Sequence, residues 1–358
     1  MQARALIVLA ALTLAACSGT TGSGTSLNVP QVTAPAGSIA KLNTITTIGS
    51  TIDAGSGAGA GDNNPYGLTI APLTAGSVIA GDLLVCNFNN AAGTQGAGTT
   101  IEDIKPAAGS APVRIAQSSS LQGCNALAVN SKNGAIWAAD YTANNNPIVS
   151  ATGSIVTTLS QNPWYGPWGQ AFNGAYNGKP AFFATNAKNG TVVRINILPG
   201  PTFSFDTILS GLSSNNGAPG NILAPAGLTY DGTSDTLYVV DSNANRVLAI
   251  HAATTTPAGT SASGSAFTSS NISVVFSGLP LAAPISSALL ANGDLVVANT
   301  ANNYLVEINP SNGAVVASKN LDTGAPGALF GLATIVVNNA QYVYFNDDNS
   351  NSVNRLSP

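Results

Sequence analysis

The sequence predicts an all-β fold, a six-bladed β-propeller with four-stranded blades. Six apolar runs that each end in Asn or Asp recur along the chain, and each run is followed by an Asn-rich turn. Consecutive run ends are 46 to 58 residues apart, which is the length of one blade with its loops. After residue 16 no segment has helical periodicity, and short apolar segments bounded by Gly, Asn and Asp are typical of strands.

The first 16 residues have the composition of an export signal. Residues 1–4 form a short basic end, and residues 5–14 form an apolar run that is too short to span a bilayer comfortably. The tetrad Leu14-Ala15-Ala16-Cys17 resembles the lipobox of bacterial lipoproteins. This resemblance implies cleavage before Cys17 and a lipid anchor on that cysteine. Cleavage of an ordinary signal near the same residue is the alternative.

The resemblance also implies a location in the bacterial cell envelope, with the chain held to a membrane by lipid. Ser18 follows the cysteine, and in proteobacterial lipoproteins this residue favours the outer membrane. Residues 17–38 are rich in Gly, Ser, Thr, Pro and Ala, so they predict the lipidated cysteine and a flexible tether of roughly 25 Å. The propeller domain, residues 39–358, would then stand off the membrane.

The ring of blades is expected to close through the two ends of the domain. The last repeat stops at Pro358 after its third strand, and the β-like segment 42–48 lies before the first repeat. Joining the two completes the sixth blade and leaves only short, protected strand edges. Residues 252–270, in the fourth repeat, consist mainly of Thr, Ser, Gly and Ala and predict a mobile surface loop.

Two of the repeats resemble a known family. Residues 236–250, TLYVVDSNANRVLAI, resemble an NHL repeat, and residues 293–308 are similar. The resemblance covers residues 65–358 and implies a propeller. It implies no single function, because NHL-like propellers include binding platforms as well as lyases and lactonases.

Cysteine usage predicts one disulfide bond. With Cys17 lipidated, Cys86 and Cys124 remain as an even pair in an oxidising compartment. Cys86 lies at the end of the second strand of the first repeat, and Cys124 shares with Tyr66 the position at the start of a first strand. We therefore expect a bridge between the first two blades, with two buried thiols as the alternative.

Charged residues are scarce. Lys, Arg, Asp and Glu make up 7% of the 358 residues, against about 25% in a typical soluble domain, and the net charge is −4. No basic patch is available, so nucleic acid is excluded as a partner, and we expect a monomer. Because the chain has few carboxylates, few ion pairs would be lost when these groups are protonated at low pH. This leads to the hypothesis that the protein works in an acid-exposed cell envelope.

Two sets of residues are candidates for a ligand-binding site at one mouth of the channel. The first set contains the residues that end the six apolar runs, which either cap their own turns or form a polar ring. They are Asn87, Asp140, Asn186, Asp241, Asn299 and Asn346. In a polar ring, Asp140 and Asp241 would supply the charge for a calcium-like ion. The second set, Tyr66, Trp168 and Phe330, forms either an aromatic platform for a sugar or apolar ligand or a packing contact between blades.

Catalytic residues are few. His251 is the only histidine, so neither a histidine-based zinc cluster nor the metal site of the peptidylglycine-type lyases of the NHL class can be built. Glu102 and Glu307 are the only glutamates, and both fall in third strands, so the Glu that metal-dependent lactonases place at the channel mouth has no counterpart. We therefore interpret the chain as an envelope-anchored, non-enzymatic scaffold without a cofactor that binds a protein or small ligand. A lactonase or lyase that depends on calcium or a similar metal is the alternative.

Overall fold

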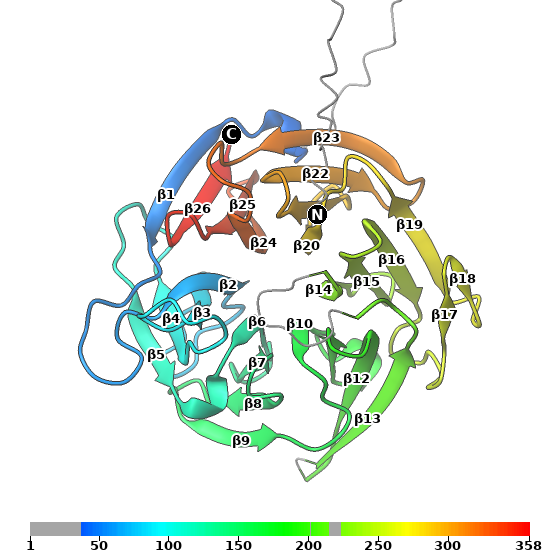
Figure 1. The fold of residues 1–358 in the computed structure, drawn as a ribbon, viewed down its shortest axis with the longest axis horizontal. Coiled ribbons are helices and arrows are strands. Elements are labelled where there is room, and N and C mark those ends of the chain that lie inside the picture. Colours follow the sequence, from blue (N-terminus) through cyan, green and yellow to red (C-terminus); the bar gives the residue numbers. More distant parts are fainter. Residues whose placement is uncertain (1–36, 201, 215–222) are drawn as a thin grey trace, which may run out of the picture. The chain divides into compact units, whose positions relative to one another are not determined.

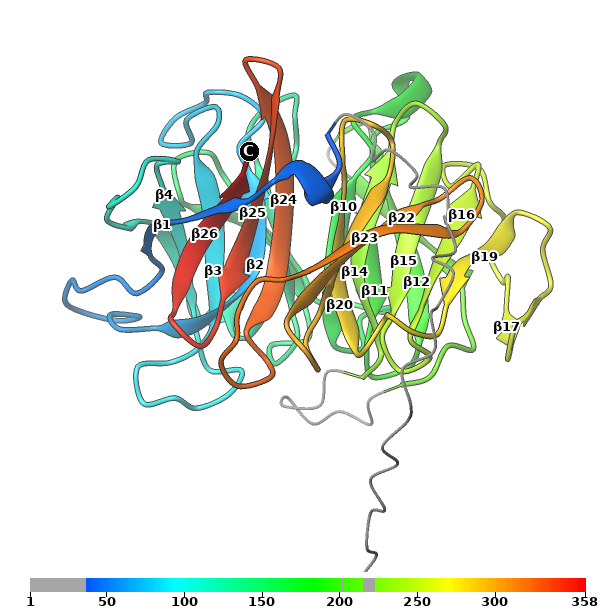
Figure 2. The same cartoon turned by 90° about the horizontal axis from the view of Figure 1, so that it is seen from above.

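Six four-stranded antiparallel sheets surround a central channel in the computed structural model (Figure 1), and Figure 2 shows the same ring from the side. The structure describes residues 37–200, 202–214 and 223–358. In this part of the chain the predicted six-bladed propeller is confirmed. The lipobox-like tetrad and all of the predicted tether before residue 37 lie outside the described residues.

The first five blades each take their strands in chain order from the channel outward. Blade 1 contains β2 (Asn63–Ile70), β3 (Leu83–Asn89), β4 (Thr100–Ile104) and β5 (Val113–Gln117). Blade 2 contains β6 (Cys124–Val129), β7 (Ile136–Asp140), β8 (Asn146–Val149) and β9 (Ile155–Leu159). Blade 3 contains β10 (Pro167–Phe172), β11 (Ala181–Asn186), β12 (Thr191–Leu198) and β13 (Thr202–Leu209).

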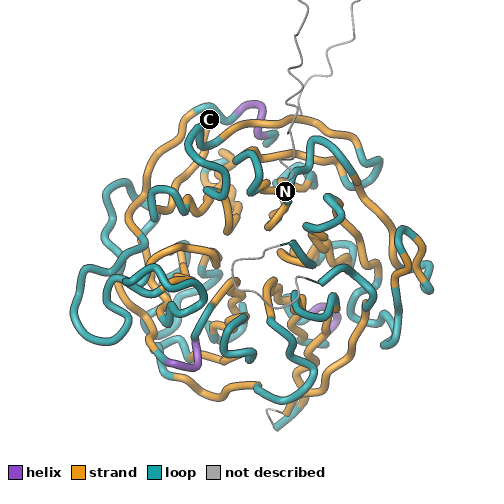
Figure 3. Tube along the Cα trace, in the orientation of Figure 1, coloured by secondary structure: helices purple, strands orange, loops and turns teal. Residues whose placement is uncertain are grey.

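Blade 4 contains β14 (Pro225–Asp231), β15 (Thr236–Asp241), β16 (Arg246–His251) and β19 (Ile272–Ser277). Blade 5 contains β20 (Pro284–Leu289), β21 (Leu295–Asn299), β22 (Tyr304–Asn309) and β23 (Ala314–Asn320). The three helices described are single 3-10 turns: η1 (Ile39–Lys41), η2 (Ser119–Leu121) and η3 (Tyr176–Gly178) (Figure 3). None of the described helices has the length and apolar character needed to cross a membrane.

Blade 6 is built from both ends of the domain, as predicted. It contains β24 (Leu329–Val337), β25 (Ala340–Asp347), β26 (Ser352–Ser357) and, on its outer edge, β1 (Thr44–Ser50). Thr44 lies opposite Ser357 in the β1/β26 pair. The segment before β1 is also fixed, because Ser38 Oγ and the Ile39 amide donate to Glu307 Oε2 of blade 5 at 2.6 and 2.9 Å.

The hydrophobic core lies between the blades. The second strands are buried on both sides, and all seven residues of β3 are buried. Blades 1 and 2 share an apolar cluster that includes Leu84 and Ile136, and blades 3 and 4 share another that includes Phe183 and Leu237. Strands buried on both faces read as continuous apolar runs, which explains why the repeat is visible in the sequence.

The insertion in blade 4 is tied down, contrary to the expectation of a mobile loop. It forms a hairpin of β17 (Ala262–Ser263) and β18 (Ala266–Phe267), and Phe267 packs against the cluster shared by blades 3 and 4. Arg194 of blade 3 donates from Nη1 to the carbonyl oxygens of Ala253 and Thr256, both at 3.0 Å. The anchor is thus a distant arginine, which the composition of the insertion does not reveal.

The predicted disulfide is present. Cys86 of β3 and Cys124 of β6 are bonded, with their Cα atoms 5.9 Å apart. The bond is a covalent link between blades 1 and 2.

Loss of this bond is expected to destabilise the fold. The double substitution Cys86→Ser/Cys124→Ser should lower the free energy of unfolding by about 2–4 kcal/mol, because the cross-link restricts the unfolded chain. Urea denaturation monitored by circular dichroism measures the change. Reducing agent should shift the wild-type midpoint to that of the variant and leave the variant unchanged. Equal midpoints for all four samples would contradict a stabilising bond.

Candidate functional site

The channel wall is built in layers, because each blade contributes one innermost strand. Each innermost strand pairs with the second strand of its blade, and the register of this pairing shifts at the same place in all six blades. The shift lies, for example, between Pro65 and Gly67 in β2 and between Leu329 and Leu332 in β24. Alignment at this shift gives three layers with one residue from each blade. The aromatic layer contains Tyr66, Asn125, Trp168, Ala226, Ile285 and Phe330. The small-residue layer contains Gly67, Ala126, Gly169, Gly227, Ser286 and Gly331. The leucine layer contains Leu68, Leu127, Gln170, Leu228, Ser287 and Leu332.

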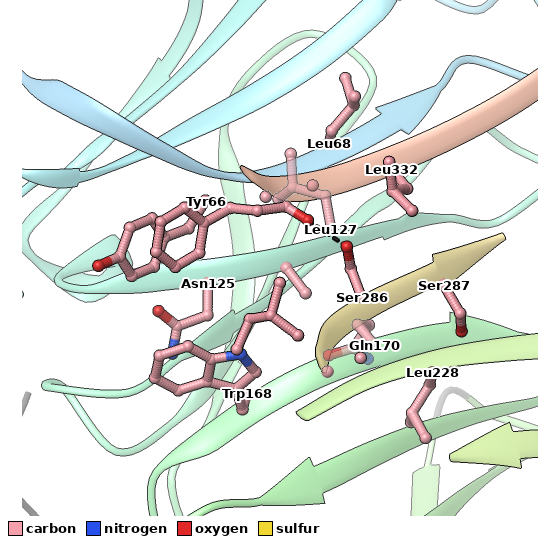
Figure 4. A pocket seen from close by; sticks show the side chains of 17 residues that line it. Tyr66, Leu68, Asn125, Leu127, Trp168, Gln170, Leu228, Ser286, Ser287 and Leu332 are labelled. Carbon is pink, nitrogen blue, oxygen red and sulfur yellow. Dashed lines mark hydrogen bonds between the residues drawn. The ribbon is translucent and has the colours of Figure 1, made fainter. Parts of the chain in front are cut away.

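These layers enclose a small space that widens at one end. All of their residues except Ala226 line an inner cavity of about 60 Å³ (Figure 4). The leucine layer also lines a wider funnel of about 430 Å³, which continues along the later residues of the same six strands. Among the described residues, neither lining contains Asp, Glu, His, Lys or Arg. The polar groups of the site are therefore uncharged: hydroxyl, amide and backbone groups and the indole N–H of Trp168.

The three predicted aromatic residues do come together at the channel. The ring centroids of Tyr66 and Phe330 are 3.7 Å apart in a stacked pair, and Phe88 stacks on Tyr66 at 4.4 Å. Trp168 lies 5.9 Å from Tyr66, and the three predicted rings are 4–6% exposed. Because the faces of Tyr66 are covered by other rings, the aromatic layer fills this end of the channel, and a ligand in the inner cavity would meet mainly ring edges.

The register corrects two assignments made from sequence spacing. In blade 2 Cys124 pairs with Asp140, and in blade 1 Pro65 pairs with Asn87, so Cys124 is the counterpart of Pro65. The next residue, Asn125, therefore takes the position of Tyr66 in blade 2. In blade 6, Leu329 pairs with Asp347, so Asp347, not Asn346, is the counterpart of Asn87. Both errors are of one residue: blade 2 has Cys124 where blade 1 has Pro65, and blade 6 ends its apolar run with two consecutive Asx residues, Asn346 and Asp347.

The residues that end the six apolar runs are buried, each 0–1% exposed. Three asparagines bind the loop that leads into their own blade. Asn87, Asn186 and Asn299 donate from Nδ2 to the carbonyl oxygens of Thr51, Pro163 and Pro280 at 2.8, 2.9 and 2.8 Å. Asn346 instead donates to the Gly67 carbonyl of the neighbouring blade at 3.1 Å. These contacts position the innermost strands, and none of the six residues lines the inner cavity or the funnel.

Asp140 and Asp241 are the last residues of the second strands β7 and β15, and both are buried. Burial raises the pKa of the Asp140 carboxyl well above its usual value. Burial also raises the pKa of Asp241, although Arg246 Nε donates to its Oδ2 at 2.8 Å. In the part of the chain that the structure describes, no three His, Cys, Asp or Glu side chains form a group that could hold a metal ion.

Two functional candidates were missed by the sequence reasoning. Gln170 takes the leucine position in blade 3 and is 6% exposed. Its Oε1 accepts a hydrogen bond from Asn146 Nδ2 at 2.6 Å, but its Nε2 has no partner. Asn125 is 5% exposed, and its Oδ1 has no partner either. An alignment of the six first strands could have drawn attention to Gln170, because the same position is leucine in four other blades.

Several buried carboxyl groups have raised pKa values. Burial, with a smaller effect of Asp53, raises the pKa of Glu102 to about 7. Burial and the neighbouring Asp347 raise the pKa of Asp348 to about 7. Burial likewise raises the pKa of Asp103 to about 6. These groups bind protons more tightly in the folded chain than in the unfolded chain.

Comparison with solved structures shows proteins that share the fold. A chain of a nidogen/laminin complex aligns with a TM-score of 0.54 over 76% of this chain and 85% of its own length, at 14% identity. Virginiamycin B lyase from Staphylococcus aureus aligns with a TM-score of 0.52 over 88% of this chain and 98% of its own, at 13% identity. A gluconolactonase from Xanthomonas campestris aligns with a TM-score of 0.52 over 83% and 88%, at 10% identity.

Such low identities establish the propeller class and nothing finer. No protein-family model matches the sequence, and no curated protein sequence matches it.

Stability is expected to rise as the pH falls from 8 to 5. The contribution of Glu102 and Asp348 is fully present below about pH 4, where both carboxyls are protonated in the folded and the unfolded chain, and it is lost as the pH rises through about 7. One pKa unit corresponds to about 1.4 kcal/mol, so each of the two groups should make the free energy of unfolding higher at pH 5 than at pH 8 by on the order of 2 kcal/mol. Urea denaturation at both pH values measures this difference.

The substitution Glu102→Gln should reduce this pH dependence, because it removes one of the titrating groups. Asp231→Asn is the control and should leave the dependence between pH 5 and pH 8 unchanged, because hydrogen bonds from Ser234 and Thr233 hold the pKa of the Asp231 carboxyl below its usual value despite partial burial. Greater stability at pH 8 than at pH 5 would contradict the assignment.

Proposed function

We propose that this chain is a lipid-anchored propeller of the bacterial cell envelope that binds a ligand in its central channel and catalyses no reaction. The composition of the channel wall carries this proposal. General acid–base catalysis relies on His, Asp, Glu, Lys, Cys or Tyr side chains. Of these, only Tyr66 and Tyr230 occur in the described linings, and burial raises the pKa of both phenols.

The envelope location is supported by the disulfide and the N-terminal sequence together. Disulfides persist mainly in proteins that fold outside the cytosol. The Cys86–Cys124 bond is therefore consistent with export, and the lipobox-like tetrad at residues 14–17 would supply the anchor.

A lactonase or lyase would need an acid, a base or a metal ion at the channel. The proteins of similar fold include a lyase and a gluconolactonase, but the likeness extends to the fold alone. Asp140 and Asp241, the candidates for such a site, lie outside both linings, so we favour binding over catalysis.

The anchor can be tested in a Gram-negative host. Wild-type protein should incorporate an alkyne-labelled fatty acid and sediment with membranes, and Cys17→Ala should abolish both properties, because only a cysteine sulfur can carry the thioether lipid. The variant Cys86→Ser/Cys124→Ser is the control and should remain labelled. Labelling of Cys17→Ala equal to that of the wild type would rule out the anchor.

The absence of catalysis can be tested on the purified full chain. We expect no stoichiometric metal by elemental analysis and no hydrolysis of lactone substrates above the buffer rate, with or without added Ca²⁺. Bound metal that is removed by a chelator together with lactonase activity would establish the enzymatic alternative. Asp140→Asn would then show whether that carboxyl takes part.

A further inference from the structure

We propose that the channel ligand is a neutral molecule with an apolar body and a hydroxyl or carboxamide head group, and that Gln170 and Asn125 hold the head. This inference rests on the proposed function and names the chemical class of its ligand. It depends on two buried polar atoms that the protein leaves without partners in one cavity.

Gln170 supplies a hydrogen-bond donor. Its Oε1 is occupied by Asn146 Nδ2 at 2.6 Å, so the amide plane is fixed by a fully buried neighbour. The Nε2 group on the other side of that amide has no partner, and Gln170 lines both the inner cavity and the funnel. A buried donor without a partner costs about 1–3 kcal/mol, which a ligand oxygen would recover.

Asn125 supplies the complementary acceptor. Its Nδ2 donates to the Pro167 carbonyl of blade 3 at 3.3 Å, and its Oδ1 has no partner. Figure 4 shows Asn125 beside Trp168, with Gln170 farther along the strand that carries Trp168. A head group that both donates and accepts, such as a hydroxyl or a primary amide, can pair with the Gln170 donor or with the Asn125 acceptor.

The size and charge of the space restrict the ligand further. The inner cavity of about 60 Å³ has room for a few polar atoms but not for an aromatic ring or a sugar. The body of the ligand would therefore lie in the funnel, whose lining includes Leu68, Leu228 and Phe172. A charged head is disfavoured, because burial of an unpaired charge is far more costly than burial of a neutral amide and no described lining residue could neutralise it.

Four probes of nearly equal shape test the head group. Benzamide both donates and accepts, acetophenone only accepts, toluene does neither, and benzoate is the charged isostere of benzamide. Affinities are measured by ligand-observed NMR titration of the Cys17→Ala chain, which avoids detergent. We expect benzamide to bind roughly tenfold more tightly than toluene, with acetophenone between them, and benzoate not to saturate.

The substitution Gln170→Leu places in blade 3 the residue that four other blades carry, and it should weaken benzamide binding roughly tenfold while leaving toluene unaffected. Gln117→Leu, on the exposed outer strand β5, is the matched control and should change neither affinity. If benzamide and toluene bind equally tightly to the wild type, the head-group assignment is overturned, but the proposal that the channel binds a ligand is kept. This comparison needs no variant. If none of the four probes binds saturably, the inference and the channel-binding function both fail.

Discussion

The close approach of each innermost strand to the next is the constraint on which the rest of the propeller depends. The glycines of the small-residue layer have no space for a Cβ: one on Gly169 would lie 2.1 Å from the Ala226 carbonyl oxygen, and one on Gly331 would lie 2.5 Å from Leu68 Cβ. This contact sets the diameter of the channel. It therefore determines the size of the inner cavity and prevents large side chains from closing it at that level.

No ion pair joins two neighbouring blade sheets among the described residues, which explains how the fold tolerates so little charge. Each seam has a disulfide or a hydrogen bond from a side chain to a backbone carbonyl. The disulfide Cys86–Cys124 joins blades 1 and 2. The hydrogen bonds run from Asn125 to Pro167 between blades 2 and 3, from Thr185 to Ala226 between 3 and 4, from Thr229 to Ser287 between 4 and 5, from Ser286 to Phe330 between 5 and 6, and from Asn346 to Gly67 between 6 and 1. The ion pairs of the described residues lie instead within single blades and their adjoining loops.

The fold was predictable because its signals are local, whereas the site was not. Apolar second strands, Asn-rich turns and the pair of cysteines that remains after Cys17 are visible in the chain itself, and they suffice for six blades, for closure by β1 and for the disulfide. The inner cavity depends on which residues of different blades share a layer, and that long-range correspondence is set by strand pairing rather than by a motif in each repeat. Spacing therefore put Cys124 where Asn125 lies, and Gln170 became a candidate only when its Nε2 was found without a partner.

The pairing of β1 with β26 makes the order of synthesis matter. Ser357 Oγ donates to the Thr44 carbonyl across 313 positions of sequence. At 5–20 residues per second the ribosome needs roughly 15 to 60 s to supply the partner of β1. Blades 1 to 5 can form during that interval, but β1 must wait as an unpaired strand with exposed backbone groups. Closure of the ring is therefore the last step open to the fold, because β1 can join its sheet only after β26 has been made.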